Sequence, residues 1–215
     1  MTREEFLSWR IEGRRVWAGE DLAGIDLSGV DLAGCDFSDA DLTGANLRGA
    51  RLMRAVLSRA RLVGADLSGA DVSFARLVGA DLSGASFEAA GLYEANLTRC
   101  LLVSANLSFS NLTRARLRRA DLTGADLSGA FLIGADLTGA SLAKARLTGA
   151  TLFRAVLSGA SVDPKALRTA RAGRTVLTGL TGQTAQAGRT IGPQTAPPAS
   201  VLRPLPASGP SGGLR

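Results

Sequence analysis

The chain has 215 residues, of which 46% are hydrophobic, 25 are Lys or Arg, 19 are Asp or Glu, and none is His. This length fits one domain with flanking segments, and the lack of His removes the side chain most often used as a general base or metal ligand. No apolar run approaches the roughly 20 residues of a membrane span, and the charged start is unlike a signal peptide. We therefore expect a cytoplasmic protein without a membrane segment.

Residues 1–19 are expected to form an N-terminal helical cap. Thr2 and Glu5 have the spacing of a reciprocal capping box, and Gly13 is a typical helix stop. A stacked β structure leaves unpaired backbone groups at its ends, which a helix can cover. The apolar side chains suited to this are in the helix expected over residues 2–12 and just after it: Phe6, Leu7, Trp9, Ile11 and Trp17.

From residue 20 to residue 162 the sequence repeats every five residues without an insertion or deletion. A central column, at residues 22, 27 and every fifth residue to 162, is Leu at 25 of its 29 sites. Two residues before it lies a column of small side chains, which is Ala at 23 of the 25 sites from 40 to 160. A period of five fits neither a helix, with about 3.6 residues per turn, nor a flat strand, with a period of about two.

Within each repeat the Ala and the Leu are two residues apart, on the same side of an extended segment, so the chain must turn before the next Ala. Gly fills 15 of the 28 second positions after the Leu between residues 24 and 159, as tight turns favour. A corner every five residues predicts a square coil of 20 residues. Coils stacked about 4.8 Å apart would pair their backbones, so we expect an all-β solenoid of about seven coils.

The repeat, (Ala)(Asp/Asn)(Leu)(Ser/Thr)(Gly), resembles that of the pentapeptide-repeat family. Residues 40–47 and 120–129 match the family pattern closely, and the resemblance covers about two thirds of the chain. It implies a right-handed quadrilateral β-helix over residues 20–162. The motif consists of packing and turn residues and carries no catalytic group, so we expect neither an enzyme nor a bound cofactor or metal.

Residues 163–181 are expected to form a C-terminal helical cap. Asp163 and Pro164 are typical of an N-cap and a first helical residue, and we expect the short helix to run to about Ala172, before Gly173. In some members of the family that the sequence resembles, a C-terminal helix forms a dimer. The resemblance therefore leaves open a homodimer through this cap.

The last segment, residues 182–215, changes to Ala, Thr, Ser, Gly and Pro. Six of the seven prolines in the chain lie from Pro193 onward, and periodic hydrophobicity ends. We expect a disordered tail, because such a segment cannot bury enough apolar surface to fold.

The two cysteines, Cys35 and Cys100, both lie in the column of small residues. They are 65 residues apart, which is more than three coils of the expected solenoid. The separation of roughly 14 Å along the axis exceeds the reach of a disulfide, so we expect two buried thiols.

Charged residues are sorted by side once the 20-residue coil is imposed. Residues 20–162 carry 14 basic and 15 acidic residues, and residues 163–215 carry seven basic and one acidic. Asp recurs on the sides centred at residues 22 and 27, where we interpret it as an outward polar residue beside a turn rather than as a catalytic carboxylate. The side centred at residues 57, 77, 97 and 117 gathers a basic stripe: Arg59, Arg76, Arg99, Arg116, Arg118 and Arg119.

The remaining side, centred at residues 52, 72, 92, 112, 132 and 152, carries most of the large residues outside the core columns. We expect these side chains to be exposed: Met53, Phe74, Tyr93, Phe131, Ile133 and Phe153, beside Arg51, Arg54, Arg114 and Arg154. Stacking of equivalent positions would join them into one apolar and basic strip. Such a strip is either tolerated on a flat β surface or marks a partner interface.

Three functions are compatible with this reading. The first is a non-catalytic interaction rod that presents flat faces to an unidentified protein partner. The second follows from the resemblance, because some pentapeptide-repeat proteins mimic a DNA duplex and modulate a type II topoisomerase, in gyrase inhibition or in quinolone or toxin protection. That mimicry needs a strongly negative surface, from which a repeat region of net charge −1 with an Arg stripe departs. Direct nucleic-acid binding through the Arg side is the third, and the sequence favours it least.

Overall fold

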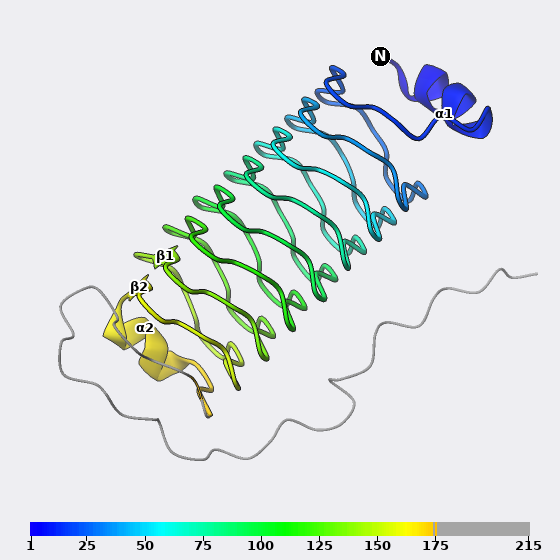
Figure 1. The fold of residues 1–215 in the computed structure, drawn as a ribbon. Helices are drawn as coiled ribbons and strands as arrows, with labels where there is room; N and C mark the ends of the chain where they lie inside the picture. The colour runs from blue at the N-terminus through cyan, green and yellow to red at the C-terminus, as the bar shows by residue number, and fades with distance from the viewer. Residues whose placement is uncertain (174, 176–215) are drawn as a thin grey trace, which may run out of the picture.

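The structure, a computed structural model, describes residues 1–173 and residue 175. These residues form a straight stack of coils with a short helix at each end (Figure 1). Helix α1 spans Arg3–Ile11 and helix α2 spans Pro164–Thr169. Strands β1, Ser141–Leu142, and β2, Ser161–Val162, pair in parallel near the C-terminal end. The tail expected over residues 182–215 lies outside the described residues.

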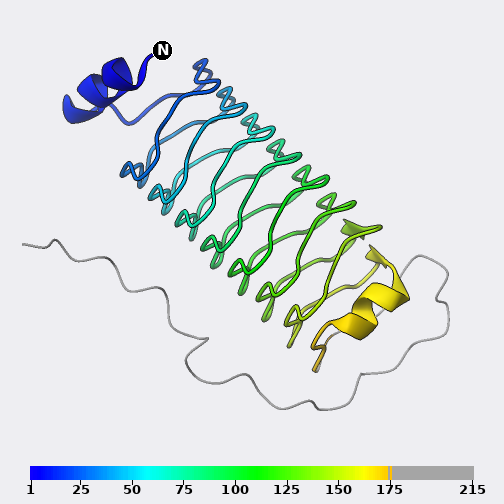
Figure 2. The ribbon, with the colours of Figure 1, turned by 180° about the vertical axis from the view of Figure 1, so that it is seen from behind.

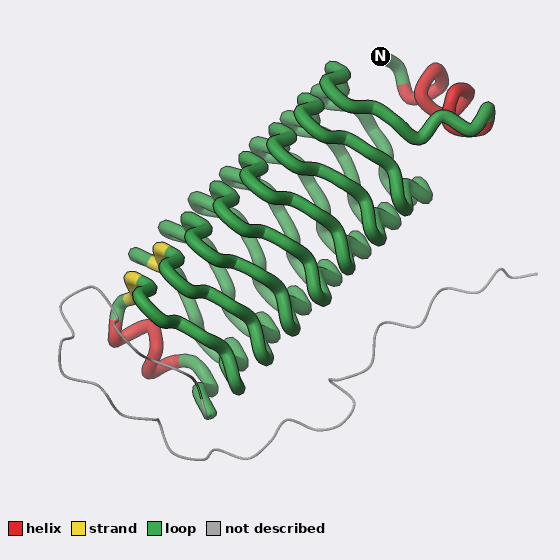
Figure 3. The backbone as a smooth tube through the Cα atoms, viewed as in Figure 1, coloured by secondary structure: helices red, strands yellow, loops and turns green. Residues whose placement is uncertain are grey.

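The coils are held in register by parallel bridges between residues 20 positions apart. The bridges run without a slip from Val16–Asp36 to Thr151–Arg171. Except at β1 and β2, each side of the coil has only one bridging residue, because the chain turns again after three extended residues. Most of the stack is therefore drawn as loop in Figure 3, although its backbone is paired throughout, and the view from behind in Figure 2 shows the same regular stacking. The expected 20-residue coil is present.

Four sides make up each coil. Side 1 is centred on residues 22, 42 and 62, side 2 on residues 27, 47 and 67, side 3 on residues 32, 52 and 72, and side 4 on residues 37, 57 and 77. At every corner an amide donates to the carbonyl three residues earlier, as from Ile25 N to Leu22 O at 3.1 Å. The second residue of each turn, from Gly19 to Gly159, has a positive φ and the first does not, which defines a type II turn.

The Asp and Asn residues before the central column complete the hydrogen bonding of each repeat. In residues 41–45 the amides of Asp41, Leu42 and Gly44 donate to carbonyls of neighbouring coils at 2.9, 2.7 and 2.9 Å, and the amide of Ala45 closes the turn at 3.0 Å. The fifth amide, that of Thr43, donates to Asp41 Oδ1 at 2.9 Å. All 11 Asp and four Asn residues at this position accept the same bond. The structural interpretation of the Asp columns is confirmed.

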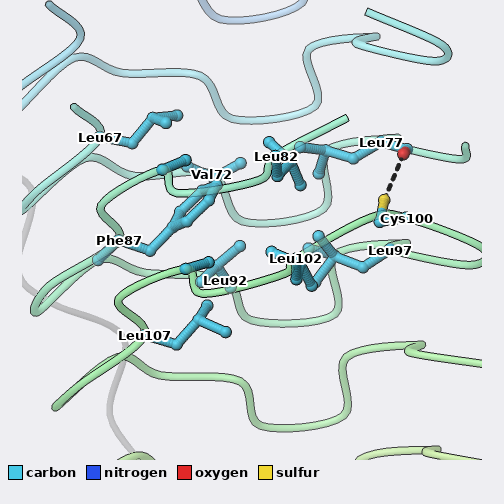
Figure 4. Packing of buried hydrophobic residues seen from close by; sticks show 14 of the residues in the cluster. Leu67, Val72, Leu77, Leu82, Phe87, Leu92, Leu97, Cys100, Leu102 and Leu107 are labelled. Atoms are coloured by element: carbon cyan, nitrogen blue, oxygen red, sulfur yellow. Dashed lines mark hydrogen bonds between the residues drawn. The ribbon is translucent and has the colours of Figure 1, made fainter. Parts of the chain in front are cut away.

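The interior is filled by the two inward columns. Figure 4 shows the central column from Leu67 to Leu107 pointing into the stack, with Val72 and Phe87 in the same positions as Leu. The Ala residues opposite are at most 5% exposed, so this column also faces the interior. Cys35 and Cys100 are buried free thiols. The Cys100 thiol donates to Leu77 O at 2.7 Å, and burial raises its pKa to about 12.

Helix α1 closes the N-terminal end. Its capping box is present, since the Glu5 amide donates to Thr2 Oγ1 at 3.2 Å and the Thr2 amide donates to Glu5 Oε2 at 2.8 Å. Phe6 is fully buried and stacks on Trp17 with ring centroids 4.0 Å apart. Ile11, which we expected in the seal, is 86% exposed. It lies five residues after Phe6, about 140° around the helix, and so faces away from the core.

Helix α2 is shorter than the sequence suggests. It ends at Thr169 rather than near residue 172, because Ala170 is extended and the Arg171 amide returns to the ladder, donating to Ala150 O at 2.7 Å. Asp163 caps the helix by accepting a 2.7 Å bond from the Lys165 amide. Arg171 bridges Thr151, 20 residues earlier, so the last coil keeps the 20-residue period. Helix α2 therefore takes the place of side 2 in this coil.

Candidate interaction surfaces

Among the residues that the structure describes, thirteen other than Gly adopt a positive φ, and nine of these lie on the two corners that border side 4. The corner between sides 3 and 4 carries Arg54, Phe74, Glu94, Arg114 and Arg154, and the corner between sides 4 and 1 carries Asp39, Arg59, Arg99 and Arg119. A side chain in this conformation costs about 1–3 kcal/mol, and Gly occupies the same position elsewhere in the stack. The repeat motif itself has Gly at this position, so these nine residues depart from the motif, and they are concentrated around one side.

Positive charge is concentrated on the same side. We call the surface formed by residues 53–59, 73–79, 93–99 and 113–119 the Arg patch; it comprises side 4 in four successive coils with its corners. It contains eight Arg and one acidic residue, Glu94, a formal charge of +7. The rest of residues 20–162 keeps six basic and 14 acidic residues, a charge of −8. A repeat region that is nearly neutral in total is therefore strongly polarised.

Only part of the Arg patch is neutralised by ion pairs. Arg59 binds Asp39, Arg114 binds Glu94, and Arg118 binds Asp136, at N–O distances of 2.6, 3.2 and 2.6 Å. Among residues 1–173 and 175, the ion pairs include none of four exposed patch residues, Arg76, Arg99, Arg116 and Arg119. These four guanidinium groups are available to a ligand.

An aromatic ladder runs along the corner between sides 3 and 4. The Arg54 guanidinium lies 5.8 Å from the centroid of the Phe74 ring, and Phe74 meets Tyr93 edge to face at 5.4 Å. Arg114 Nη1 donates to Tyr93 Oη at 3.1 Å. Each contact joins one coil to the next. The rings of Phe74 and Tyr93 are thus held by their neighbours, within the Arg patch.

A second cluster of large apolar side chains lies on side 3, toward the C-terminal end. Phe131 bridges Asn111 and Thr151 in the ladder, with Ile133 two residues on and Phe153 in the coil after Ile133. We call Phe109, Phe131, Ile133 and Phe153 the Phe patch. Phe109 is 62% exposed at the corner between sides 2 and 3, and a Cβ added to Gly129 would come within 2.7 Å of its ring. Gly129, which has no Cβ, thus makes room for the Phe109 ring.

The comparisons with known proteins identify the repeat. A family model described as pentapeptide repeats matches residues 21–59, 65–102, 100–139 and 132–163 in eight copies. The chain belongs to the pentapeptide-repeat family. Membership implies a right-handed quadrilateral β-helix, in agreement with the bridges between residues 20 positions apart. No protein of curated function matches the sequence.

Solved pentapeptide-repeat structures are similar to this chain. HetL, a protein involved in heterocyst differentiation regulation from the cyanobacterium Nostoc sp. strain PCC 7120, is 34% identical over 84% of this chain and 92% of its own, with a TM-score of 0.41. A trypsin-treated variant of QnrB1, a plasmid-mediated fluoroquinolone resistance protein, is 20% identical over 77% of this chain and 88% of its own, with a TM-score of 0.56. At 20% sequence identity, the similarity to QnrB1 shows a shared fold alone.

The pentapeptide-repeat coil divides the residues singled out from the sequence into two groups. All six residues of the basic stripe lie in the Arg patch, together with five of the strip: Met53, Arg54, Phe74, Tyr93 and Arg114. Phe131, Ile133, Phe153 and Arg154 lie around the Phe patch instead, where the Arg154 guanidinium is 5.3 Å from the Phe153 ring centroid. Arg51 belongs to neither, since it pairs with Asp31 at 3.8 Å on side 3. The strip is thus two surfaces, not one.

The exposure expected for the apolar residues is only partly right. Phe74 is 40% exposed, but the other five are half-buried. Side chains of the next coil lie only about 4.8 Å away along the axis and cover part of each. Two exposed residues were missed, Leu101 at 45% on side 1 and Phe109. Both interrupt a column of polar residues or Gly, which is the same signal that singled out Phe74.

The acidic sides of the pentapeptide-repeat stack are partly neutralised. Arg61 binds Asp41, Arg48 binds Asp66 and Arg146 binds Asp126, at 3.3, 3.1 and 3.3 Å. Three Asp residues of side 1 have no ion pair among the described residues: Asp21, Asp81 and Asp121. The described residues contain no cluster of three or more His, Cys, Asp or Glu residues arranged to hold a metal ion, and no helix long and apolar enough to cross a membrane.

Proposed function

We propose that this protein is a non-catalytic interaction rod that presents the Phe patch to a protein partner. The observation that carries the proposal is the Phe patch, in which four large apolar side chains occupy outward positions of adjacent coils. The repeat motif places Asp, Asn, Ser, Thr or Gly at these positions, and Phe109 adopts a φ of 57° that favours Gly. Aromatic residues are enriched at protein interfaces and supply much of their binding energy.

The surroundings of the Phe patch suit a protein interface. Exposed Arg side chains border the apolar ones: the Arg154 guanidinium lies 5.3 Å from the Phe153 ring centroid, and the Arg114 amide donates to Ile133 O at 2.9 Å. Polar residues at the edge of an apolar patch are typical of protein interfaces. The patch lies on a stiff ladder, so binding would order few side chains that are mobile in the free protein. Phe131 and Phe153 are already half-buried in the monomer.

A double variant of the full chain tests this proposal. Replacing Phe131 and Phe153 with Ser should leave the free energy of unfolding within about 1 kcal/mol, as at other surface sites. The same change should reduce the amount of partner that co-purifies from the native host, measured by quantitative mass spectrometry, or should abolish self-association in sedimentation velocity. The matched control replaces Asp81 and Asp121 on side 1 with Ser. Equal capture by the parent and the Phe131 and Phe153 variant, both folded, would contradict the proposal.

Modulation of a type II topoisomerase is the second candidate. The observation that favours it is the charge of −8 that the repeat region carries outside the Arg patch, with the unpaired Asp21, Asp81 and Asp121 on side 1. The ion pairs of Asp41, Asp66 and Asp126 and the Arg patch weaken the likeness to a DNA surface. A supercoiling assay with purified gyrase separates the two candidates. Inhibition or protection that is lost on replacing Asp81 and Asp121, but kept without Phe131 and Phe153, would favour this function.

A further inference from the structure

We propose that the Arg patch binds the phosphate backbone of double-stranded DNA without reading its base sequence. This site goes beyond the proposed function and uses a different side of the rod from the Phe patch. The two surfaces adjoin at Arg114, so one molecule could hold DNA on side 4 and a protein on side 3.

The spacing of the free guanidinium groups is the first argument. Arg76 and Arg116 occupy the same column two coils apart, roughly 10 Å along the axis, and Arg99 and Arg119 occupy equivalent corners of adjacent coils, about 4.8 Å apart. Arg99 and Arg119 also adopt the positive φ that favours Gly. Stacked like charges in a strained conformation destabilise the free protein, and an anionic ligand would remove the repulsion.

The composition of the patch distinguishes between classes of ligand. Charged residues are depleted at the centre of protein interfaces, whereas protein–DNA interfaces are far more positive. The Arg patch has eight Arg and one acidic residue, and Arg114 holds that acid, Glu94, at 3.2 Å. A planar guanidinium group can bind two oxygens of one phosphate at once, so each free Arg of the patch suits a phosphate contact. These features favour a phosphate backbone over an acidic protein.

The aromatic residues favour a duplex over a single strand. Proteins that bind single strands stack the bases on free aromatic rings. In the Arg patch Phe74 meets Tyr93 edge to face, Arg54 lies over Phe74, and Tyr93 Oη accepts from Arg114. The rings are therefore engaged with the protein. A duplex presents one negative charge per about 1.7 Å of its axis, so a straight row of coils meets several phosphates at once.

The flat shape of side 4 explains why no sequence preference is expected. Base edges are read by a helix, a β-ribbon or an arm that enters a groove. The patch presents only side chains from a flat ladder, and its register has no inserted loop. Contacts would be to phosphates, with an affinity that depends steeply on salt.

The experiment measures binding of the full chain to a fluorescent duplex of about 20 base pairs by anisotropy, from about 50 to 200 mM salt, the range in which phosphate contacts are lost. The test variant replaces Arg99, Arg116 and Arg119 with Gln. The control variant removes the same charge from sides 1 and 2, replacing Arg48, Arg61 and Arg146 with Gln. Both keep the basic residues 163–215. Circular dichroism confirms the fold of each.

The proposal predicts that the test variant binds at least about tenfold more weakly, and that the slope of log K against log salt falls by about 1 for each Arg removed. The control variant should keep both the affinity and the slope of the parent. Equal binding by the parent and the test variant would overturn the proposal. Tighter binding to a single strand, equal displacement by poly-L-glutamate at matched charge, or no binding at the lowest salt would overturn it too.

Discussion

Arg59 and Asp39 occupy the same turn position in successive coils and are joined by two parallel hydrogen bonds, from Nε to Oδ1 at 2.7 Å and from Nη2 to Oδ2 at 2.6 Å. Both residues have a positive φ, of 59° and 60°. The coil spacing therefore brings residues 20 positions apart into direct contact. The same relation joins Arg61 to Asp41, Arg114 to Glu94 and Arg146 to Asp126.

The carboxylates of Asp39 and Asp26 should make the protein less stable in acid. The hydrogen bond from Arg59 lowers the pKa of Asp39 from 3.8, and the hydrogen bonds from the amide and hydroxyl of Ser28 lower the pKa of Asp26. A carboxyl with a lower pKa in the folded state stabilises the fold above its unfolded pKa, and the effect is lost as the pH falls through the folded pKa. The thermal midpoint should be flat above about pH 5 and fall below about pH 4.

Replacing Asp26 and Asp39 with Asn checks the cause of this pH dependence. Asn at position 26 keeps an oxygen for the Ser28 amide but does not titrate. The fall of the thermal midpoint below pH 4 should be shallower in the double variant, measured by circular dichroism. An unchanged profile would mean that other groups control acid unfolding.

The small-residue column should be limited by space. Ala125 is fully buried opposite the Leu column, so Ala125→Leu should overpack the interior and cost about 1–3 kcal/mol in the free energy of unfolding. Thr148 is exposed, and Thr148→Leu should change that free energy by less than about 0.5 kcal/mol. Denaturant unfolding measures both. Equal stability of Ala125→Leu and the parent would show that this column does not face the core.

The Asp residues before the central column should stabilise the turns through one oxygen. Asp81 accepts a 3.1 Å bond from the Ser83 amide and has no ion pair in the described part of the chain. Asp81→Ala should therefore cost about 0.5–1.5 kcal/mol, the usual net value of a hydrogen bond, while Asp81→Asn should cost less because the amide oxygen can accept the same bond. If Ala and Asn are equally tolerated in urea unfolding, the bond contributes nothing measurable.

The two thiols should be unreactive in the folded protein. Burial raises the pKa of Cys100 to about 12 and also raises that of Cys35, and both side chains are fully covered. Because the thiolate is the reactive form, a thiol reagent at pH 8 should label neither residue until denaturant is added. Labelling under native conditions, followed by absorbance, would show that the coils open locally.

The fold could be predicted from the sequence because each repeat position has one physical task. Leu and Ala in fixed columns required an inward face, and Gly at the second position after Leu required a turn. The task of the Asp column was only half predicted, as polar residues beside turns. The specific reason for Asp or Asn is that one amide in each repeat, such as that of Thr43, has no backbone carbonyl to donate to and donates to the Asp or Asn side chain instead. This becomes visible only when all the hydrogen bonds of the ladder are known.

The candidate surfaces were harder to predict, since they depend on how coils cover one another. Arg59 lies 20 residues after Asp39, so their ion pair could have been predicted from the sequence. Arg59 would then have been left out of the Arg residues of the basic stripe that are free to bind a ligand. Phe109 was missed because it ends side 2 rather than lying within side 3. The end of α2 at Thr169 follows from the return of Arg171 to the ladder, a tertiary contact that outweighs local helix propensity.

We propose that the residues that depart from the repeat motif at the corners bordering sides 3 and 4 serve binding rather than folding. Denaturant unfolding of a variant with Arg99→Gly, Phe109→Gly and Arg119→Gly tests it most directly, because each change restores the motif at a positive φ. The free energy of unfolding should rise, because about 1–3 kcal/mol of strain is relieved at each residue, while the greater freedom of each Gly in the unfolded chain costs roughly 0.5–1 kcal/mol. A variant less stable than the parent would show that the three side chains support the fold rather than binding.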